Sequence, residues 1–271
     1  MLLALTRELS PAIARCELTH HEREAIDVDL ARAQHAAYEA RLRDAGCRVE
    51  RLAAGPDMPD SVFIEDTAIV FDEVAIITRP GAASRRAETA GVADALRKYR
   101  PLYQMASPAT ADGGDVLVVG HQVFVGRSSR TNDAGIEEMR RVLTPYGYEV
   151  TAIDVRGCLH MKSAATRVGD DLLLINPAWL PSLPSGPFAS FDHIDVHPDE
   201  PSAANALTID EQIIYPTAFP RTLERLQRCG LHVATVDASE VAKAEGAVTC
   251  CSLILSLRSK SEDLWTTRAK C

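Results

Sequence analysis

Four pairs of short apolar runs, each pair joined by two turn-prone residues, recur along this chain of 271 residues. The turns begin at Asp72, Gly120, Gly169 and Asp210, so successive turns are 48, 49 and 41 residues apart. Two short apolar runs around such a dipeptide are typical of a β-hairpin. A period of this size predicts that the chain folds as a series of repeated supersecondary units.

Predicted helices lie between the hairpins. They cover residues 31–45, 84–99, 132–143 and 221–229. The first stops before Gly46, a residue type that often ends helices, and Ser84 is a candidate N-cap of the second. Another short strand follows, as at residues 148–153 and 232–236. The third unit shows no clear helix, and residues 181–187 are predicted to form a loop. The repeated unit is therefore strand, strand, helix, strand.

The two ends of the chain are predicted to build a fifth unit together. The N-terminal segment would combine with a C-terminal strand near Cys250 and close a ring of units. No Gly/Ser-rich linker divides the sequence, so residues 1–271 are expected to form a single catalytic domain, with residues 259–271 as a polar tail. The predicted fold class is therefore α/β, and the alternative is an α+β sandwich in which the spacing is coincidental.

Charge and cysteine content exclude several classes of protein. The formal net charge is −9 and no Lys/Arg run offsets it, which argues against a general nucleic-acid or anionic-membrane binder. The seven cysteines are scattered, odd in number and without CxxC spacing, which indicates a reducing compartment and no structural zinc site. The apolar run at residues 1–5 is too short for a secretion signal, and no apolar stretch approaches the roughly 20 residues that cross a bilayer. We therefore expect a soluble, cytoplasmic protein.

Cys250 is the strongest candidate nucleophile. It lies among small and β-prone residues at the start of a short predicted strand. A thiol can act as a nucleophile when the fold supplies a proton-transfer group, an orienting carboxylate and a cationic environment or substrate. His160, just before the third hairpin, is the best histidine for the proton transfer, and Asp112 opens the second hairpin in an Asp-Gly-Gly-Asp turn. Taken singly, a lone histidine is more often structural, and the Asp-Gly-Gly-Asp segment could equally be only a turn.

Further charged residues suit a small charged substrate. Asp60, Glu65 and Asp66 flank a short apolar run, and a carboxylate buried there needs a cationic partner. Arg85 and Arg130 occupy equivalent places in two units, soon after a hairpin and near a helix start. Two arginines that converge can hold a carboxylate in bidentate fashion. The alternative for each of these residues is a solvated surface charge.

Taken together, these segments resemble the dimethylarginine dimethylaminohydrolases, which belong to the guanidino-group-modifying (pentein) enzymes. The resemblance rests on the order of several short motifs between about residues 18 and 255. They are Pro-Asp-Ser-Val-Phe-Ile-Glu-Asp, Ser-Arg-Arg, Asp-Gly-Gly-Asp, Ser-Arg-Thr-Asn, Leu-His-Met-Lys-Ser, Ala-Ala-Asn and Thr-Cys-Cys-Ser. The resemblance implies a five-fold pseudo-symmetric α/β propeller of ββαβ units around a central active-site channel, and this fold accounts for the repeat period.

The resemblance also implies a role for each candidate residue. Cys250 corresponds to the nucleophile, His160 to the general acid and base, and Asp112 to the carboxylate that orients the histidine. Glu65 would have a supporting role at the substrate. Cys251 matches a cysteine that only some relatives have, and we expect it to be non-essential. The residues expected to bind the substrate are Leu18, Asp60, Glu65, Asp66, Arg85, Arg130 and Val248.

The implied substrate contacts divide by charge. Asp66 would hold the guanidinium, and the pair Arg85 and Arg130 would hold the α-carboxylate. Asp60 and the backbone of Leu18 would receive the α-amino group.

The implied activity is hydrolysis of Nω-methylated arginine, either asymmetric dimethylarginine or monomethylarginine, to citrulline and dimethylamine or methylamine. The reaction would run through a covalent S-alkylthiouronium on the cysteine. No cofactor or metal is expected, and zinc would bind only as an inhibitor. The expected partner is the small-molecule substrate, with no nucleic acid and no membrane, and a homodimer is compatible with the resemblance. The alternatives are an arginine deiminase-like hydrolase of unmethylated arginine or another substituted guanidine, a thiol redox sensor, and a non-catalytic binding propeller.

Overall fold

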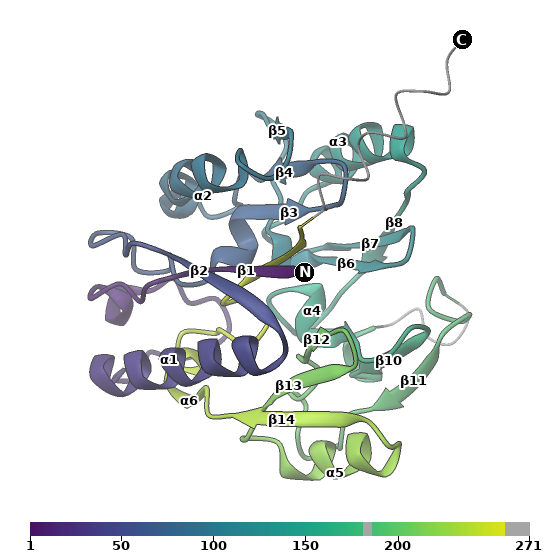
Figure 1. Ribbon diagram of the computed structural model, residues 1–271. Coiled ribbons are helices and arrows are strands. Elements are labelled where there is room, and N and C mark those ends of the chain that lie inside the picture. Colours follow the sequence, from purple (N-terminus) through teal and green to yellow (C-terminus); the bar gives the residue numbers. More distant parts are fainter. Residues whose placement is uncertain (181–185, 258–271) are drawn as a thin grey trace.

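Five three-stranded sheets surround a common centre in the computed structural model, which describes residues 1–180 and 186–257 (Figure 1). In every sheet the middle strand pairs antiparallel with one neighbour and parallel with the other. The sheets are β15 (Leu253–Ser256), β1 (Leu2–Arg7) and β2 (Cys47–Leu52); β3 (Ala68–Val70), β4 (Ala75–Ile77) and β5 (Leu102–Gln104); β6 (Val116–Val119), β7 (Gln122–Arg127) and β8 (Glu149–Asp154); β9 (Ala165–Arg167), β10 (Leu172–Ile175) and β11 (Asp192–Asp195); and β12 (Leu207–Ile209), β13 (Gln212–Pro216) and β14 (His232–Val236).

The predicted repeat is confirmed, including the unit built from both ends of the chain. The antiparallel pairs β3–β4, β6–β7, β9–β10 and β12–β13 are the four predicted hairpins. β1 lies between β15 and β2, with Leu3 opposite Leu255 and Ala4 opposite Ile254. The ring of units is therefore closed by pairing between two strands that lie near opposite ends of the described sequence.

Helices connect the middle strand to its parallel neighbour, because two parallel strands need a crossover. They are α1 (Val28–Asp44), α2 (Thr89–Leu96), α3 (Asp133–Leu143) and α5 (Pro220–Arg228). Between β10 and β11 the described residues form only the 3-10 turn η6 (Pro177–Trp179), as expected for the unit without a clear helix. Residues 181–185 of the predicted loop and the whole predicted tail, 259–271, lie outside the described residues.

Two helix starts differ from the sequence prediction for local reasons. α1 begins three residues earlier than expected, because the Asp27 side chain accepts hydrogen bonds from the backbone N–H groups of Asp29 and Leu30 and caps it there. α2 begins at Thr89, because residues 83–88 form the 3-10 helix η3 (Ala83–Glu88). The prediction that Ser84 caps this helix is wrong, since its hydroxyl donates to Glu17 Oε1 at 2.5 Å.

The remaining helices are short and lie mostly in the connections between units. They are η1 (Ile13–Arg15), η2 (Ile64–Thr67), η4 (Gly113–Asp115), η5 (Thr144–Tyr146), α4 (Met161–Ala164) and α6 (Ser239–Ala242). η2, η4 and α4 each end directly before β3, β6 or β9.

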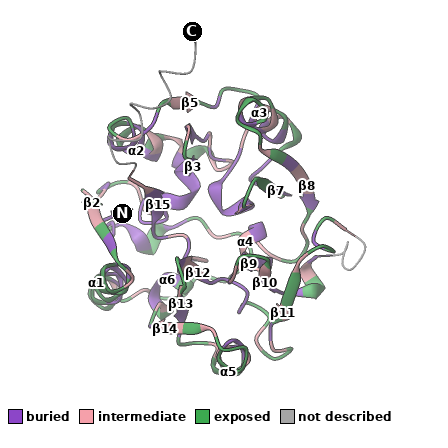
Figure 2. Cartoon of the chain, turned by 45° about the vertical axis from the view of Figure 1, so that its right-hand side comes forward, coloured by how far each residue is buried: buried purple, intermediate pink, exposed green. Residues whose placement is uncertain are grey.

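We call β3, β6, β9, β12 and β15 the inner strands, because together they line a central cavity of about 240 Å³. The outer faces of α1, α3 and α5 are exposed, the middle strands β1, β4, β7, β10 and β13 are mostly buried, and the third strands such as β11 and β14 are largely half-buried or exposed (Figure 2). Since all five inner strands run toward the same face, the segments that precede them meet at the other end of the cavity. Glu65, Gly113, Lys162 and Thr249, one from each of four such segments, line the cavity there.

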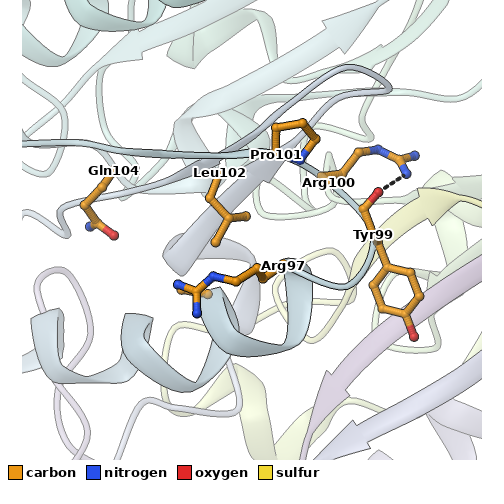
Figure 3. A pocket seen from close by; sticks show the side chains of 7 residues that line it. Arg97, Tyr99, Arg100, Pro101, Leu102 and Gln104 are labelled. Atoms are coloured by element: carbon orange, nitrogen blue, oxygen red, sulfur yellow. Dashed lines mark hydrogen bonds between the residues drawn. The ribbon is translucent and has the colours of Figure 1, made fainter.

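A separate groove on the outside of the ring lies between the end of α2 and β5 (Figure 3). Arg100 there donates to the carbonyl oxygen of Tyr99 at 2.9 Å and, from the same buried guanidinium, to that of Ser256 at 2.6 Å. The groove contains none of the predicted site residues. The hydrogen bond from Arg100 to Ser256 ties the second unit to β15. Among the described helices, none combines the length and the apolar character that a membrane crossing requires.

Candidate active site

Cys250 lies in the turn before β15, at the end of the ring where the preceding segments meet. Its backbone oxygen accepts from the N–H of Glu65 at 3.1 Å, and its own N–H donates to Ala247 at 3.2 Å. Burial raises the pKa of the Cys250 thiol well above its usual value, and the carboxylates of Glu65 and Asp66 raise it further. The sulfur is therefore a neutral thiol at physiological pH until a positive charge approaches it.

His160 lies directly before α4 and is held by a carboxylate on each side. Its Nε2 is 3.1 Å from Asp112 Oδ2, and its Nδ1 is 4.0 Å from Asp66 Oδ1. Burial lowers the pKa of His160, but the charge of Asp66 and the hydrogen bond to Asp112 outweigh it and raise the pKa to about 9. The ring is therefore an imidazolium at neutral pH and can donate a proton.

The Asp-Gly-Gly-Asp turn brings three segments close together. A side chain at Gly113 would meet the backbone oxygen of Glu65 at 2.0 Å, and one at Gly114 would meet His160 Nδ1 at 2.6 Å. Only glycine fits at these two positions, as expected where a backbone approaches a neighbour closely. Asp112 is fixed in turn, because its Oδ1 accepts from the N–H of Gly81 at 2.9 Å.

The second carboxylate of this turn, Asp115, was not among the predicted site residues. Its oxygens accept from the hydroxyls of Ser128 and Thr131 at 2.5 and 2.7 Å and from the N–H of Met161 at 3.0 Å. It thereby holds the residue that follows His160. Burial raises the pKa of Asp115 to about 6, against the lowering effect of His160. The repeated acid in Asp-Gly-Gly-Asp was the available sequence signal for this role.

Asp66 is the anionic centre of the site. Its Oδ2 accepts from Arg85 Nη1 at 2.6 Å, and its Oδ1 accepts from the N–H of Gly114 at 3.0 Å. Burial raises the pKa of Asp66, but the charges of His160 and Arg85 lower it more, so the net pKa is below the ordinary value. The group is therefore a carboxylate beside the thiol of Cys250, in the pocket that both residues line.

The two arginines differ in the hydrogen bonds that their guanidinium groups donate to the protein. Arg85 is buried and donates to Asp66, to Glu88 at 3.0 Å and to the carbonyl oxygen of Phe63 at 2.9 Å. Arg130 donates from Nη2 to the Thr19 hydroxyl at 2.9 Å. If Arg85 holds a substrate carboxylate while Asp66 holds its guanidinium, as the resemblance implies, the direct contact between these two residues has to open on binding.

One small pocket of about 20 Å³ brings together most of the predicted residues. Its lining includes Asp60, Asp66, Arg85, Arg130, His160 and Cys250. Asp112 lies behind His160, and Glu65 lies beneath the pocket at the central cavity, in an ion pair of 2.6 Å with Lys162. Val248 is 1% exposed within an apolar cluster, so its side chain packs in the core and does not line the pocket.

The segment of residues 17–21, which we call the lid segment, lies against this pocket. The N–H of Glu17 donates to both oxygens of Asp60, at 3.1 and 3.2 Å. Glu245 accepts from the consecutive N–H groups of Thr19, His20 and His21, at 2.9, 2.5 and 2.7 Å. Leu18 is half-buried and packs against the apolar cluster that contains Val248. Glu245, which also lines the pocket, was missed because a glutamate beside a glycine carries no sequence signal for such a contact.

Asp66, Asp112 and His160 are also close enough to bind a metal ion, with ligand atoms within 4.8 Å of one another. Their atoms already have partners, since Asp66 accepts from Arg85 and Gly114 and Asp112 faces His160. Each of these atoms therefore already has a partner within the protein. Inhibition by zinc stays a prediction.

The comparisons with known proteins decide the family. The family model for the eukaryotic N,N dimethylarginine dimethylhydrolases matches residues 13–183. The chain is also 40% identical over 255 residues to an N(G),N(G)-dimethylarginine dimethylaminohydrolase of Streptomyces coelicolor, a match that covers 93% of this chain and 96% of that protein. The chain belongs to the dimethylarginine dimethylaminohydrolase family. The predicted resemblance is thus confirmed.

Solved structures agree with this family and with the propeller fold. The dimethylarginine dimethylaminohydrolase of Pseudomonas aeruginosa, as a mutant in complex with citrulline, superposes with a TM-score of 0.87 at 32% identity and covers 93% of this chain and 98% of that chain. The N-terminal domain of the cyanobacterial arginine dihydrolase ArgZ superposes with a TM-score of 0.83 at 17% identity and covers 94% of this chain and 97% of that one. The second match shows the fold alone. The predicted α/β propeller of the dimethylarginine dimethylaminohydrolases is therefore confirmed.

Proposed function

We propose that this chain hydrolyses Nω-methylated arginine to citrulline and dimethylamine or methylamine through a covalent adduct on Cys250. The observation that carries the proposal is one pocket lined by a thiol, an imidazolium and a carboxylate, Cys250, His160 and Asp66. The names of the relatives from S. coelicolor and P. aeruginosa and the citrulline complex of the latter support the same substrate class.

Each charged group of the substrate would bind to side chains of opposite charge in the pocket. Asp66 would accept hydrogen bonds from the guanidinium, which stays protonated at neutral pH. Arg130, with Arg85 once its contact to Asp66 opens, would hold the α-carboxylate in bidentate fashion. Asp60 would accept from the α-amino group together with the backbone of Leu18. A zwitterionic amino acid with a cationic end would thus meet a group of opposite charge at each end.

The substrate itself would activate the nucleophile. In the free protein burial and two carboxylates keep the pKa of Cys250 high, so the thiol is protonated. A guanidinium beside Asp66 places positive charge next to the sulfur and lowers that pKa, so the thiol releases its proton to solvent. The thiolate then attacks the guanidinium carbon and forms a tetrahedral adduct.

His160 would move the protons that follow. As an imidazolium it donates a proton to the methylated nitrogen, so that the carbon–nitrogen bond breaks, the amine leaves and an S-alkylthiouronium remains on Cys250. The neutral imidazole then takes a proton from water, and the resulting hydroxide attacks the same carbon. Collapse of this second adduct breaks the carbon–sulfur bond, releases the sulfur as a thiolate and the hydroxyl proton to that thiolate or to solvent, and forms the C=O bond of citrulline. Asp112 would keep the ring oriented through both steps.

The proposed function is tested by product analysis. The purified protein is incubated with asymmetric dimethylarginine, monomethylarginine and arginine, and citrulline, dimethylamine, methylamine and ammonia are measured. We expect citrulline and the matching amine from the methylated substrates. Citrulline and ammonia from arginine alone would assign a deiminase instead, and no citrulline from any of them would refute a hydrolase of this class.

The proposed reaction requires only the protein, its substrate and water. Every step above uses protein side chains, substrate and water, so we propose that no cofactor takes part. The six cysteines among the described residues are all free, which supports the proposed cytoplasmic location. Mass measurement in solution would decide between the monomer and the proposed homodimer.

Glu245 should control substrate affinity through the lid segment. Replacing Glu245 by alanine removes the carboxylate that three consecutive backbone N–H groups share. A hydrogen bond to a charged group contributes about 1.5–3 kcal/mol, and partial exposure of this one reduces its effect, so we expect KM to rise roughly 3–10-fold with kcat little changed. Steady-state kinetics of Glu245→Ala measure both. Glu24→Ala, at an exposed glutamate just after the lid segment, is the control. An equal rise in KM in both variants would refute the role.

A further inference from the structure

Asn205 is a buried amide at the end of the ring where the segments that precede the inner strands meet. The proposed mechanism gives this residue no role. It is 4% exposed and stands two residues before β12, as Asp66 stands two residues before β3. Four of the five segments that precede the inner strands already supply a site residue, namely Asp66, Asp112, His160 and Cys250. The segment before β12 supplies Asn205.

The side chain of Asn205 joins two of the other segments. Its Oδ1 accepts from the N–H of Thr249 at 3.1 Å, and its Nδ2 donates to the Thr249 hydroxyl at 3.0 Å. The same Nδ2 donates to the backbone oxygen of Lys162 at 3.2 Å. Thr249 directly precedes Cys250, and Lys162 is two residues after His160. One amide therefore spans the short segments that carry the two reacting groups.

Further contacts link these two segments to a third one, which carries Glu65. The Thr249 hydroxyl, which accepts from Asn205, donates to Glu65 Oε2 at 2.8 Å, and Lys162 Nζ donates to Glu65 Oε1 at 2.6 Å. The N–H of Glu65 donates to the backbone oxygen of Cys250 at 3.1 Å. Asn205, Thr249 and Glu65 are all buried, so water does not replace these hydrogen bonds at low cost.

We infer that Asn205 is a positioning residue of the proposed hydrolysis, which fixes the Cys250 segment relative to the His160 segment. The inference rests on the proposed function, since it assumes that these two residues react with one substrate. Asn205 itself does not line the pocket and touches no reacting atom. A displacement of about 1 Å between reacting groups can cost about 100-fold in rate, so a fixed distance between the two segments matters.

The chemistry of the contacts requires an amide. One end of the side chain accepts from an N–H while the other donates to two oxygens. An ionised aspartate has the same shape but only accepts, so it would face the Thr249 hydroxyl and the Lys162 carbonyl without a proton to donate. It would also add negative charge near Glu65, in a region that already holds several carboxylates.

The test compares Asn205→Asp with the matched control Asn176→Asp. Asn176 is equally buried at 4% exposure, and its side chain likewise donates to a backbone oxygen, of Pro201, and accepts from a backbone N–H, of Ala178. We expect Asn205→Asp to lower kcat roughly 10–100-fold with KM within about three-fold of the wild type. The control should lose similar thermal stability but keep kcat within about two-fold. Equal effects of the two variants on kcat would overturn the inference.

A second pair of variants decides the question if Asn205→Asp does not fold. Thr249→Val removes the hydroxyl that links Asn205 to Glu65, whereas Thr249→Ser keeps it. We expect the valine variant to lose at least about 10-fold in kcat and the serine variant to retain most of it. A valine variant as active as the serine variant would contradict the inference.

Alkylation of Cys250 separates this inference from the proposed function. The rate of modification by iodoacetamide is followed against pH on the peptide that contains Cys250, in a Cys251→Ser background and without any substrate. Thr249→Val, which breaks the link to Asn205 without adding a charge, should change the pH at which Cys250 reacts, and Thr249→Ser should not. An unchanged profile in Thr249→Val would count against the inference even in an active enzyme. A changed profile beside a wild type that releases no citrulline would refute the proposed function and leave the link between the segments standing.

Discussion

Replacement of Cys250 by serine is expected to abolish citrulline formation. A serine hydroxyl is far less acidic than a thiol, so the charge of a bound guanidinium does not ionise it and no covalent adduct forms. We expect kcat to fall by roughly 10⁴–10⁶-fold, the size of loss found when a covalent nucleophile is removed. Substrate should still bind, because Asp66 and Arg130 are unchanged. Citrulline assays give kcat, and calorimetric titration with asymmetric dimethylarginine gives the affinity of the inactive variant.

The neighbouring Cys251 is the matched control for this prediction. It is 4% exposed and its sulfur faces the carbonyl oxygen of Ala247 at 3.7 Å. Burial, with the charge of Glu65, raises the pKa of Cys251 to about 12, and it does not line the pocket. Cys251→Ser should therefore keep kcat within a few-fold of the wild type. A fully active Cys250→Ser variant would refute the mechanism. An inactive Cys251→Ser variant would mean that Cys250 is the wrong choice of nucleophile.

The hairpins of the fold could be predicted from the sequence because each is encoded by adjacent residues. Each hairpin is a run of adjacent residues, so the pairs β3–β4 and β12–β13 follow from alternation and turn residues alone. The start of α2 was not accessible in the same way. Residues 83–88 adopt a 3-10 turn in which Arg85 reaches Asp66 and Glu88, and this tertiary contact overrides the helical pattern.

The site was only partly predictable, because its supporting contacts join distant residues. Cys250, His160 and Asp66 were candidates on local sequence alone and received their roles from the resemblance of the motifs taken together, and the three line one pocket. Glu245 and Asn205 were not candidates, since an ordinary glutamate or asparagine becomes informative only when its partners are known. The hydrogen bonds of Glu245 reach 226 residues back to Thr19, and no local pattern encodes such a distance.

His160→Gly is expected to lower kcat by about 10²–10⁴-fold, the usual contribution of a general acid or base. Without the imidazolium, the amine would have to leave as an unprotonated anion, or wait for a proton from water. The tetrahedral adduct on Cys250 would still form but would release the amine only slowly. Because glycine leaves room for a free ring, added imidazole should restore part of the rate, which a purely structural loss would not allow.

The pH dependence of the wild type tests the same role. The carboxylates around His160 raise its pKa to about 9, so the ring is protonated below that pH and loses its proton above it. Release of the amine needs the protonated form, so kcat/KM, which reports the free enzyme, should fall as pH rises through about 9 and should stay high toward neutral pH. Measurement of kcat/KM with asymmetric dimethylarginine at concentrations well below KM, from pH 6 to about 10.5, gives the profile. Asp112→Asn removes one of the charges that raise this pKa and should move the fall to lower pH. A fall at the same pH in Asp112→Asn, or a profile that keeps its fall in His160→Gly, would assign the titration to another group.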